Sequence, residues 1–141
     1  MILTSHYFQK PHSAEQEKAA ADLLASVNAI CLEAQTAGVF DFGNDPDTGC
    51  PISGSQGGDG DGGFRTPGTR TGASGSAHRK ALAVDVWDPG HKLSDWVTDA
   101  KLEAYGLYRE HPNWTKGSDP SKNWAHFQSI PPASGARSFQ P

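Results

Sequence analysis

The sequence predicts a loop-rich α+β domain. Three observations predict this class: a long amphipathic stretch near the N-terminus, a Gly- and Asp-rich stretch after it, and two short strand-like segments in the second half of the chain. The 141 residues suffice for one domain, 1–141, because a second core would be too small to be stable. A hydrophobic fraction of 35%, with 16 glycines and 10 prolines, predicts a modest core surrounded by loops.

The amphipathic stretch predicts a helix that begins after Ser13 and ends at Gly38. Ser13 can cap its first turn, where Glu15 and Glu17 suit the positive end of the helix dipole. Gly38 is a natural stop signal. Apolar residues recur at steps of three and four and form one stripe for the core, namely Leu23, Leu24, Val27, Ile30, Cys31 and Ala34.

The later elements are shorter. Residues 41–63 hold half of the 16 glycines and five aspartates and predict a long irregular loop. Residues 81–87 predict a half-buried strand that ends at an Asp-Pro-Gly turn. A second helix is predicted from about Ser94 to Gly106, and residues 123–130 predict another short strand before a Pro-rich tail.

Composition excludes several classes of protein. The net charge of −4 and the scattered basic residues argue against a nucleic-acid partner. No apolar run is long enough to span a membrane, and the first residues, MILTSHYFQKPHS, lack the basic and apolar regions of a signal peptide. Cys31 and Cys50 form no CxxC motif, so a cysteine zinc site is excluded and two free thiols are expected rather than one bridge.

The Asp-rich loop offers one alternative metal site. Four aspartates could bind calcium and make the chain a calcium-stabilised surface adhesin, namely Asp45, Asp47, Asp59 and Asp61. The spacing of an EF-hand loop is missing, however, and Asp-Gly pairs are ordinary turn formers. We therefore favour a different site.

His78 and Asp85 are separated by six residues, with His78 before the first predicted strand and Asp85 inside it. Imidazole and carboxylate are standard zinc ligands, and a catalytic zinc site uses three of them plus a water. His126 is favoured as the third, because it lies in a strand-like segment where Trp124 and Phe127 can hold it. By spacing alone the question stays open: Asp85 could cap a turn, and other histidines are available, namely His6, His12, His91 and His111.

Three motifs then occur in order along the chain. They are Gly63-Phe64-Arg65, the segment SAHRKALAVD from Ser76 to Asp85, and Trp124-Ala-His126. Together they resemble the motifs G-[FY]-R, S-x-H-x-x-G-x-A-x-D and W-x-H of the D-alanyl-D-alanine carboxypeptidase and dipeptidase-like zinc peptidases, which have a hedgehog-like fold. The resemblance covers about half of the chain, and its central His/Asp motif is the most specific part.

This resemblance implies a zinc cofactor held by His78, Asp85 and His126, on a small antiparallel sheet with the N-terminal helix packed behind it. It also implies that Arg65 binds the substrate carbonyl or its developing oxyanion. Ser76 either supports the site through a hydrogen bond or is a simple turn residue. The implied activity is hydrolysis of a peptide bond in a bacterial peptidoglycan peptide, as a carboxypeptidase or endopeptidase.

The sequence departs from the family pattern at two places. Ala81 replaces the usual glycine, and the positions that often carry the general base hold Asn123 and Trp124. A substitute carboxylate could come from Glu110 or Asp119, and we favour Glu110, because it follows the end of the second helix. Glu110 could instead be a solvated acid paired with a neighbouring arginine or lysine.

The resemblance and the missing export signal together imply a phage-type lysis or virion enzyme. The alternative is a zinc-bearing, catalytically inactive module of a phage particle or secretion machine, with a phage structural partner. Asn123 favours this alternative, because an amide cannot accept a proton as a general base.

Overall fold

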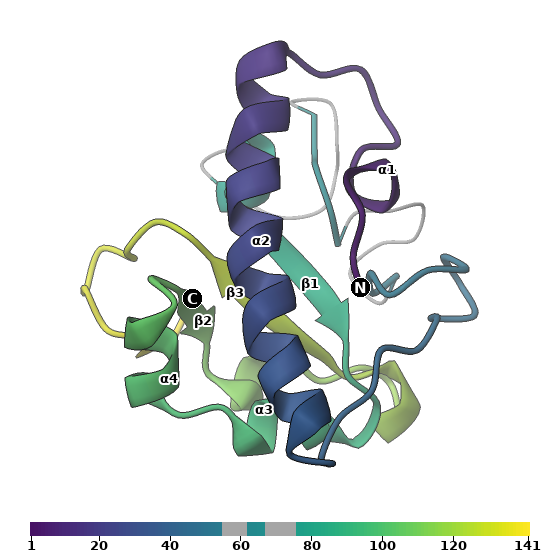
Figure 1. Ribbon diagram of the computed structural model, residues 1–141, viewed down its shortest axis with the longest axis vertical. Coiled ribbons are helices and arrows are strands. Elements are labelled where there is room, and N and C mark those ends of the chain that lie inside the picture. The colour runs from purple at the N-terminus through teal and green to yellow at the C-terminus, as the bar shows by residue number, and fades with distance from the viewer. Residues whose placement is uncertain (55–61, 67–75) are drawn as a thin grey trace.

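A computed structural model of the chain describes residues 1–54, 62–66 and 76–141. These residues form an α+β fold in which the long helix α2 lies across a four-stranded mixed sheet (Figure 1). The helices are α1 (Thr4–Tyr7), α2 (Ala14–Thr36), α3 (Lys92–Trp96) and α4 (Asp99–Ala104), and the strands are β1 (Ala83–Trp87), β2 (Tyr108–Glu110), β3 (Trp124–Gln128) and β4 (Ser138–Phe139). Short 3-10 helices connect them, namely η1 (Ala77–Lys80), η2 (Pro89–His91), η3 (Pro112–Trp114) and η4 (Pro120–Lys122).

Helix α2 confirms the prediction for the N-terminal stretch. The Ser13 hydroxyl accepts a hydrogen bond from the backbone N–H of Gln16 at 3.1 Å, and the Gln16 side chain accepts one from the N–H of Ser13 at 2.8 Å. This reciprocal capping box satisfies two N–H groups that the helix itself cannot bond. Beyond the end of the helix, Gly38 adopts a φ of +74°, a conformation that favours glycine.

The single helix predicted from about Ser94 to Gly106 is wrong in detail, because the structure has two helices there. The first begins earlier, since the Asp88 carboxylate accepts hydrogen bonds from the N–H groups of Leu93 and Ser94. Thr98 then caps α4 and accepts a hydrogen bond from the N–H of Lys101. Two extended residues, Val97 and Thr98, separate the two helices, so two local caps override a continuous apolar pattern.

The sheet has the strand order β1-β3-β2-β4. Strands β1, β3 and β2 pair antiparallel, as expected, whereas β4 pairs parallel to β2, so the complete four-stranded sheet is mixed. The parallel pair forms because the Pro-rich tail returns beside β2, where the N–H of His111 donates to the carbonyl of Phe139 at 2.8 Å. Neither β2 nor β4 was predicted from the sequence.

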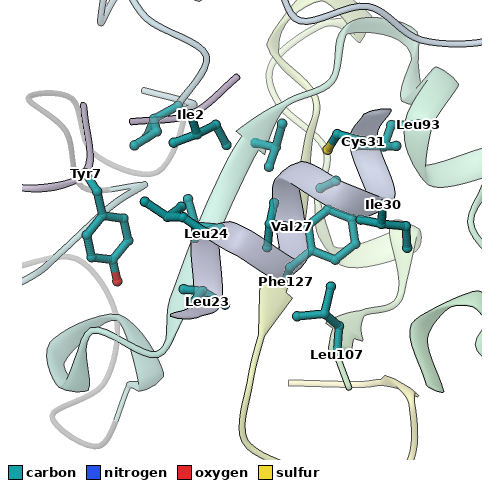
Figure 2. Close-up of a cluster of buried hydrophobic side chains, with 14 of the residues drawn as sticks. Ile2, Tyr7, Leu23, Leu24, Val27, Ile30, Cys31, Leu93, Leu107 and Phe127 are labelled. Carbon is teal, nitrogen blue, oxygen red and sulfur yellow. The ribbon is translucent and has the colours of Figure 1, made fainter. Parts of the chain in front are cut away.

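The core lies between α2 and one face of the sheet. In Figure 2 the apolar stripe of α2 faces Phe127 of β3 and Leu107, which precedes β2. Tyr7 closes one end of this core, and its buried hydroxyl donates to the carbonyl of Ala83 at 2.7 Å. The six stripe residues predicted from the sequence are all buried.

Strand alternation places the polar residues on the opposite face of the sheet. Val84 pairs with Phe127 in the register of β1 and β3, and both belong to the apolar core. The next pair is Asp85 with His126, whose side chains therefore point to the other face. The pairing of β3 with β2 continues this row to Glu110, at the end of β2. A single row of side chains thus crosses three strands.

Candidate metal centre

Three predicted ligands meet on this polar face. Asp85 and His126 are direct cross-strand neighbours, and His78 reaches them from η1, immediately before β1. All three side chains are buried. Ser76 caps η1, since its hydroxyl accepts a hydrogen bond from the N–H of His78 at 3.3 Å. Ala81 ends η1 with a φ of +58°, a left-handed conformation that glycine adopts with less strain.

The ligand atoms are spaced as a bound metal ion requires. His78 Nε2 lies 3.3 Å from Asp85 Oδ1 and 3.3 Å from His126 Nδ1, and the last two atoms are 2.9 Å apart. In a tetrahedral site with metal–ligand distances of about 2.0 to 2.1 Å, neighbouring ligand atoms are about 3.3 Å apart. The His78, Asp85 and His126 group could therefore hold a metal ion with little rearrangement.

Two of the ligands are oriented by contacts on the side away from this convergence. His78 Nδ1 lies 2.8 Å from the carbonyl oxygen of Gly63, so Nδ1 carries the hydrogen and Nε2 keeps its lone pair. The second carboxylate oxygen of Asp85 accepts a hydrogen bond from the Arg65 guanidinium at 3.4 Å. Arg65 is itself buried, and its guanidinium contacts the Asp85 ligand directly.

In the metal-free group, the pKa values of the three ligands depend on their burial and on their close contacts with one another. Burial alone would raise the pKa of Asp85, but the charge of His78 and the hydrogen bonds from both histidines hold that pKa well below its ordinary value. Burial lowers the pKa of His78. Burial also opposes the charge on His126, but the hydrogen bond and charge of Asp85, together with the charge of Glu110, raise the pKa of His126 to about 9.

Glu110 lies beside the group, as its position in the strand register requires. Its Oε2 is 3.3 Å from His126 Nδ1, although Glu110 is not part of the compact set of three ligands. Burial raises the pKa of Glu110 above its ordinary value. The neighbouring Arg109 bonds instead to the Ser138 hydroxyl and the Ser94 carbonyl.

The other proposed base positions lie elsewhere. Asp119 is exposed and caps η4 through hydrogen bonds from Ser121. The Asn123 side chain accepts a hydrogen bond from the N–H of Gly117 at 3.0 Å and stabilises the loop before β3. Of the two candidate bases, Glu110 and Asp119, only Glu110 lies beside the metal group.

A cavity of about 280 Å³ opens onto the three ligands. Its remaining wall contains two charged side chains, Arg65 and Glu110, together with Gln128 and several small or apolar residues, namely Ser76, Ala77, Phe139 and Pro141. A larger cavity of about 780 Å³ lies at the C-terminal end of α2 and beside η2, and none of the residues that line it belongs to the metal group.

The alternative histidine ligands take part in local structure. His91 is buried, with Nε2 2.8 Å from the carbonyl oxygen of Thr115. His111 accepts a hydrogen bond from the N–H of Asn113, His6 accepts one from the N–H of Leu3, and the ring of His12 stacks on a phenylalanine. None of the four joins the described metal group.

Two of the four aspartates considered for calcium have structural partners. The Asp45 carboxylate accepts hydrogen bonds from the N–H groups of Asp47 and Gly54, and Asp47 forms an ion pair with Lys122 at 2.9 Å. Asp59 and Asp61 lie outside the described residues. Cys31 and Cys50 are both buried free thiols, as expected.

Comparison with protein-family models, curated proteins and solved structures finds no match for this chain. The candidate metal centre therefore rests on the geometry of its own residues, and the resemblance of the three sequence motifs stays a prediction. Within the described ranges, no helix has both the length and the apolar character needed to cross a membrane.

Proposed function

We propose that this chain is a zinc-dependent hydrolase that cleaves a peptide bond in bacterial peptidoglycan peptides. One observation carries the proposal: a buried group of two imidazoles and one carboxylate opens onto a cavity that also holds a glutamate and an arginine. Two nitrogen ligands and one oxygen ligand suit zinc, and a three-residue set is typical of catalytic rather than structural zinc sites.

A zinc ion at this site would supply Lewis acidity and lower the pKa of a water molecule to about 7. Glu110 supplies the proton acceptor, because its carboxylate lies on the cavity side of His126 and its pKa is raised toward the range that suits a general base. As the product forms, the same carboxyl can return the proton to the leaving amine.

Arg65 has two roles in this proposal. Its contact with Asp85 fixes the carboxylate that serves as a ligand. Its guanidinium also lines the cavity, where a positive charge stabilises negative charge that develops on a carbonyl oxygen during hydrolysis.

The substrate class is the one that the resemblance of the three sequence motifs implies, and the size of the cavity agrees with it. A volume of about 280 Å³ is at the small end for ligand sites and suits the end of a short peptide with small side chains. The position of Glu110 in the cavity wall favours an enzyme over the inactive phage module. Asn123 lies outside the cavity, so its identity does not decide whether a general base is present. Asn123→Glu should accordingly add little activity.

The direct test is incubation of the zinc-loaded protein with defined muropeptides, followed by mass spectrometry. We expect one peptide bond to be cleaved, and Glu110→Gln to lower the rate by about 10² to 10⁴-fold while zinc stays bound. Intact muropeptides after prolonged incubation with the zinc-loaded protein would contradict hydrolysis and favour the inactive phage or secretion module. Equal rates for wild type and Glu110→Gln would refute the assigned base.

A further inference from the structure

Gln128 is a buried polar residue that does not belong to the hydrophobic core. It is the last residue of β3, two residues after His126, and so points to the same face of the sheet. Its side chain is buried, where an unbonded amide would be unfavourable. Both ends of the amide are bonded, with Oε1 2.8 Å from His126 Nε2 and Nε2 2.8 Å from the carbonyl oxygen of Ile130.

These two contacts fix the orientation of the amide. The carbonyl of Ile130 can only accept a hydrogen bond, so the NH₂ group of Gln128 must face it. The oxygen of the amide must then face His126, and an oxygen acceptor requires a hydrogen on His126 Nε2. The opposite orientation would set two oxygens against each other at Ile130.

We propose that Gln128 is a positioning residue that assigns the hydrogen of His126 to Nε2 and so directs the lone pair of Nδ1 to the metal. Nδ1 is the atom that lies 2.9 Å from Asp85 Oδ1 and 3.3 Å from His78 Nε2. The inference rests on the metal centre of the proposed function and is independent of hydrolysis.

The two histidine ligands are thus held in opposite ways. His78 presents Nε2 and donates from Nδ1 to a backbone carbonyl, whereas His126 presents Nδ1 and donates from Nε2 to the side chain of Gln128. Because the second partner is a side chain, it can be replaced without changing any ligand. Such partners fix both the tautomer and the ring orientation of metal-bound histidine.

The test compares zinc affinity in full-length variants by competition with a chelator of known affinity. Gln128→Met keeps the length of the side chain but removes the acceptor, and should weaken zinc binding by about 10 to 100-fold. Gln128→Glu retains an oxygen acceptor and should bind zinc several-fold more tightly than Gln128→Met. Asn123→Met is the matched control, because it removes a similarly buried amide at the other end of β3, and its affinity should equal that of wild type.

A spectroscopic measurement separates positioning from packing. In the zinc-loaded protein with ¹⁵N-labelled histidine, long-range ¹H–¹⁵N correlation should show His126 protonated at Nε2. Gln128→Met should shift the Nε2–H resonance, because the hydrogen bond to Gln128 is lost, without loss of folded dispersion. A proton on Nδ1 of His126 in wild type would overturn the inference, as would unchanged affinity in Gln128→Met or equal weakening in Gln128→Glu.

The outcomes also separate this inference from the proposed function. If the wild-type protein binds no zinc, both the inference about Gln128 and the proposed function are refuted. If zinc binding depends on Gln128 but muropeptides stay intact, only the proposed hydrolytic activity is refuted.

Discussion

The affinity of this site for zinc should rise steeply with pH, because His126 must lose a proton before it can bind a metal. In the metal-free protein the Asp85 and Glu110 carboxylates raise the pKa of His126 to about 9. At pH 7 the protonated form is therefore favoured by about 100 to 1, which is equivalent to about 2.7 kcal/mol of binding free energy. The apparent affinity should rise about tenfold per pH unit from pH 7 and level off near pH 9.

Competition titrations between pH 6.5 and 9.5, corrected for the protonation of the competing chelator, measure this slope directly. Calorimetry in buffers of different ionisation enthalpy should show about one proton released per zinc at pH 7. Glu110→Gln removes a carboxylate 3.3 Å from His126 Nδ1, so the plateau should begin at a lower pH. An affinity that does not change between pH 7 and 9 would refute the reasoning.

Three further predictions test the site by substitution. Replacing His78, Asp85 or His126 by Ala should remove the bound zinc, as measured by metal analysis of purified protein, and full occupancy in any of these variants would exclude that residue as a ligand. Arg65→Ala should slow hydrolysis about 100-fold and, because Arg65 contacts Asp85, also weaken zinc binding about tenfold or more; unchanged turnover would exclude the role at the oxyanion, and unchanged zinc affinity would exclude the role at Asp85. Gly63→Ala should destabilise the fold by about 1 to 3 kcal/mol in denaturant titrations and weaken zinc binding, since a Cβ would lie 2.5 Å from a backbone oxygen of the N-terminal segment; wild-type values for both would contradict that packing.

Local signals explain which elements of the fold could be predicted. Helix α2 was predictable because its cap, its apolar stripe and its stop residue all lie within the segment itself. Strands β2 and β4 contain three and two residues, too few for a periodic pattern, and they exist through pairing between segments far apart in the chain. The early start of α3 depends on a cap from Asp88, which lies outside the segment predicted as a helix.

The residues of the candidate site also differ in whether a local sequence signal predicts them. His78, Asp85 and His126 could be selected because the resemblance of their motifs was added to residue type, whereas spacing alone left other histidines open as ligands. The contact of Glu110 with His126 depends on the register of β2 and β3, which no local pattern specifies.

Two residues that contact His126 were not predicted from the sequence, and only one of them had a local sequence signal. Gln128 follows His126 by two residues in a predicted strand, so alternation places both on one face. Phe139, whose ring meets that of His126 edge-on, reaches the cavity only through the parallel pairing of β4.

The central claim is that His78, Asp85 and His126 form the metal site, and crystallography at the zinc absorption edge tests it most directly. Crystals of the zinc-loaded protein should give one anomalous peak per chain, about 2.0 to 2.2 Å from His78 Nε2, Asp85 Oδ1 and His126 Nδ1. A peak at another histidine, or no peak within reach of these three atoms, would contradict the claim.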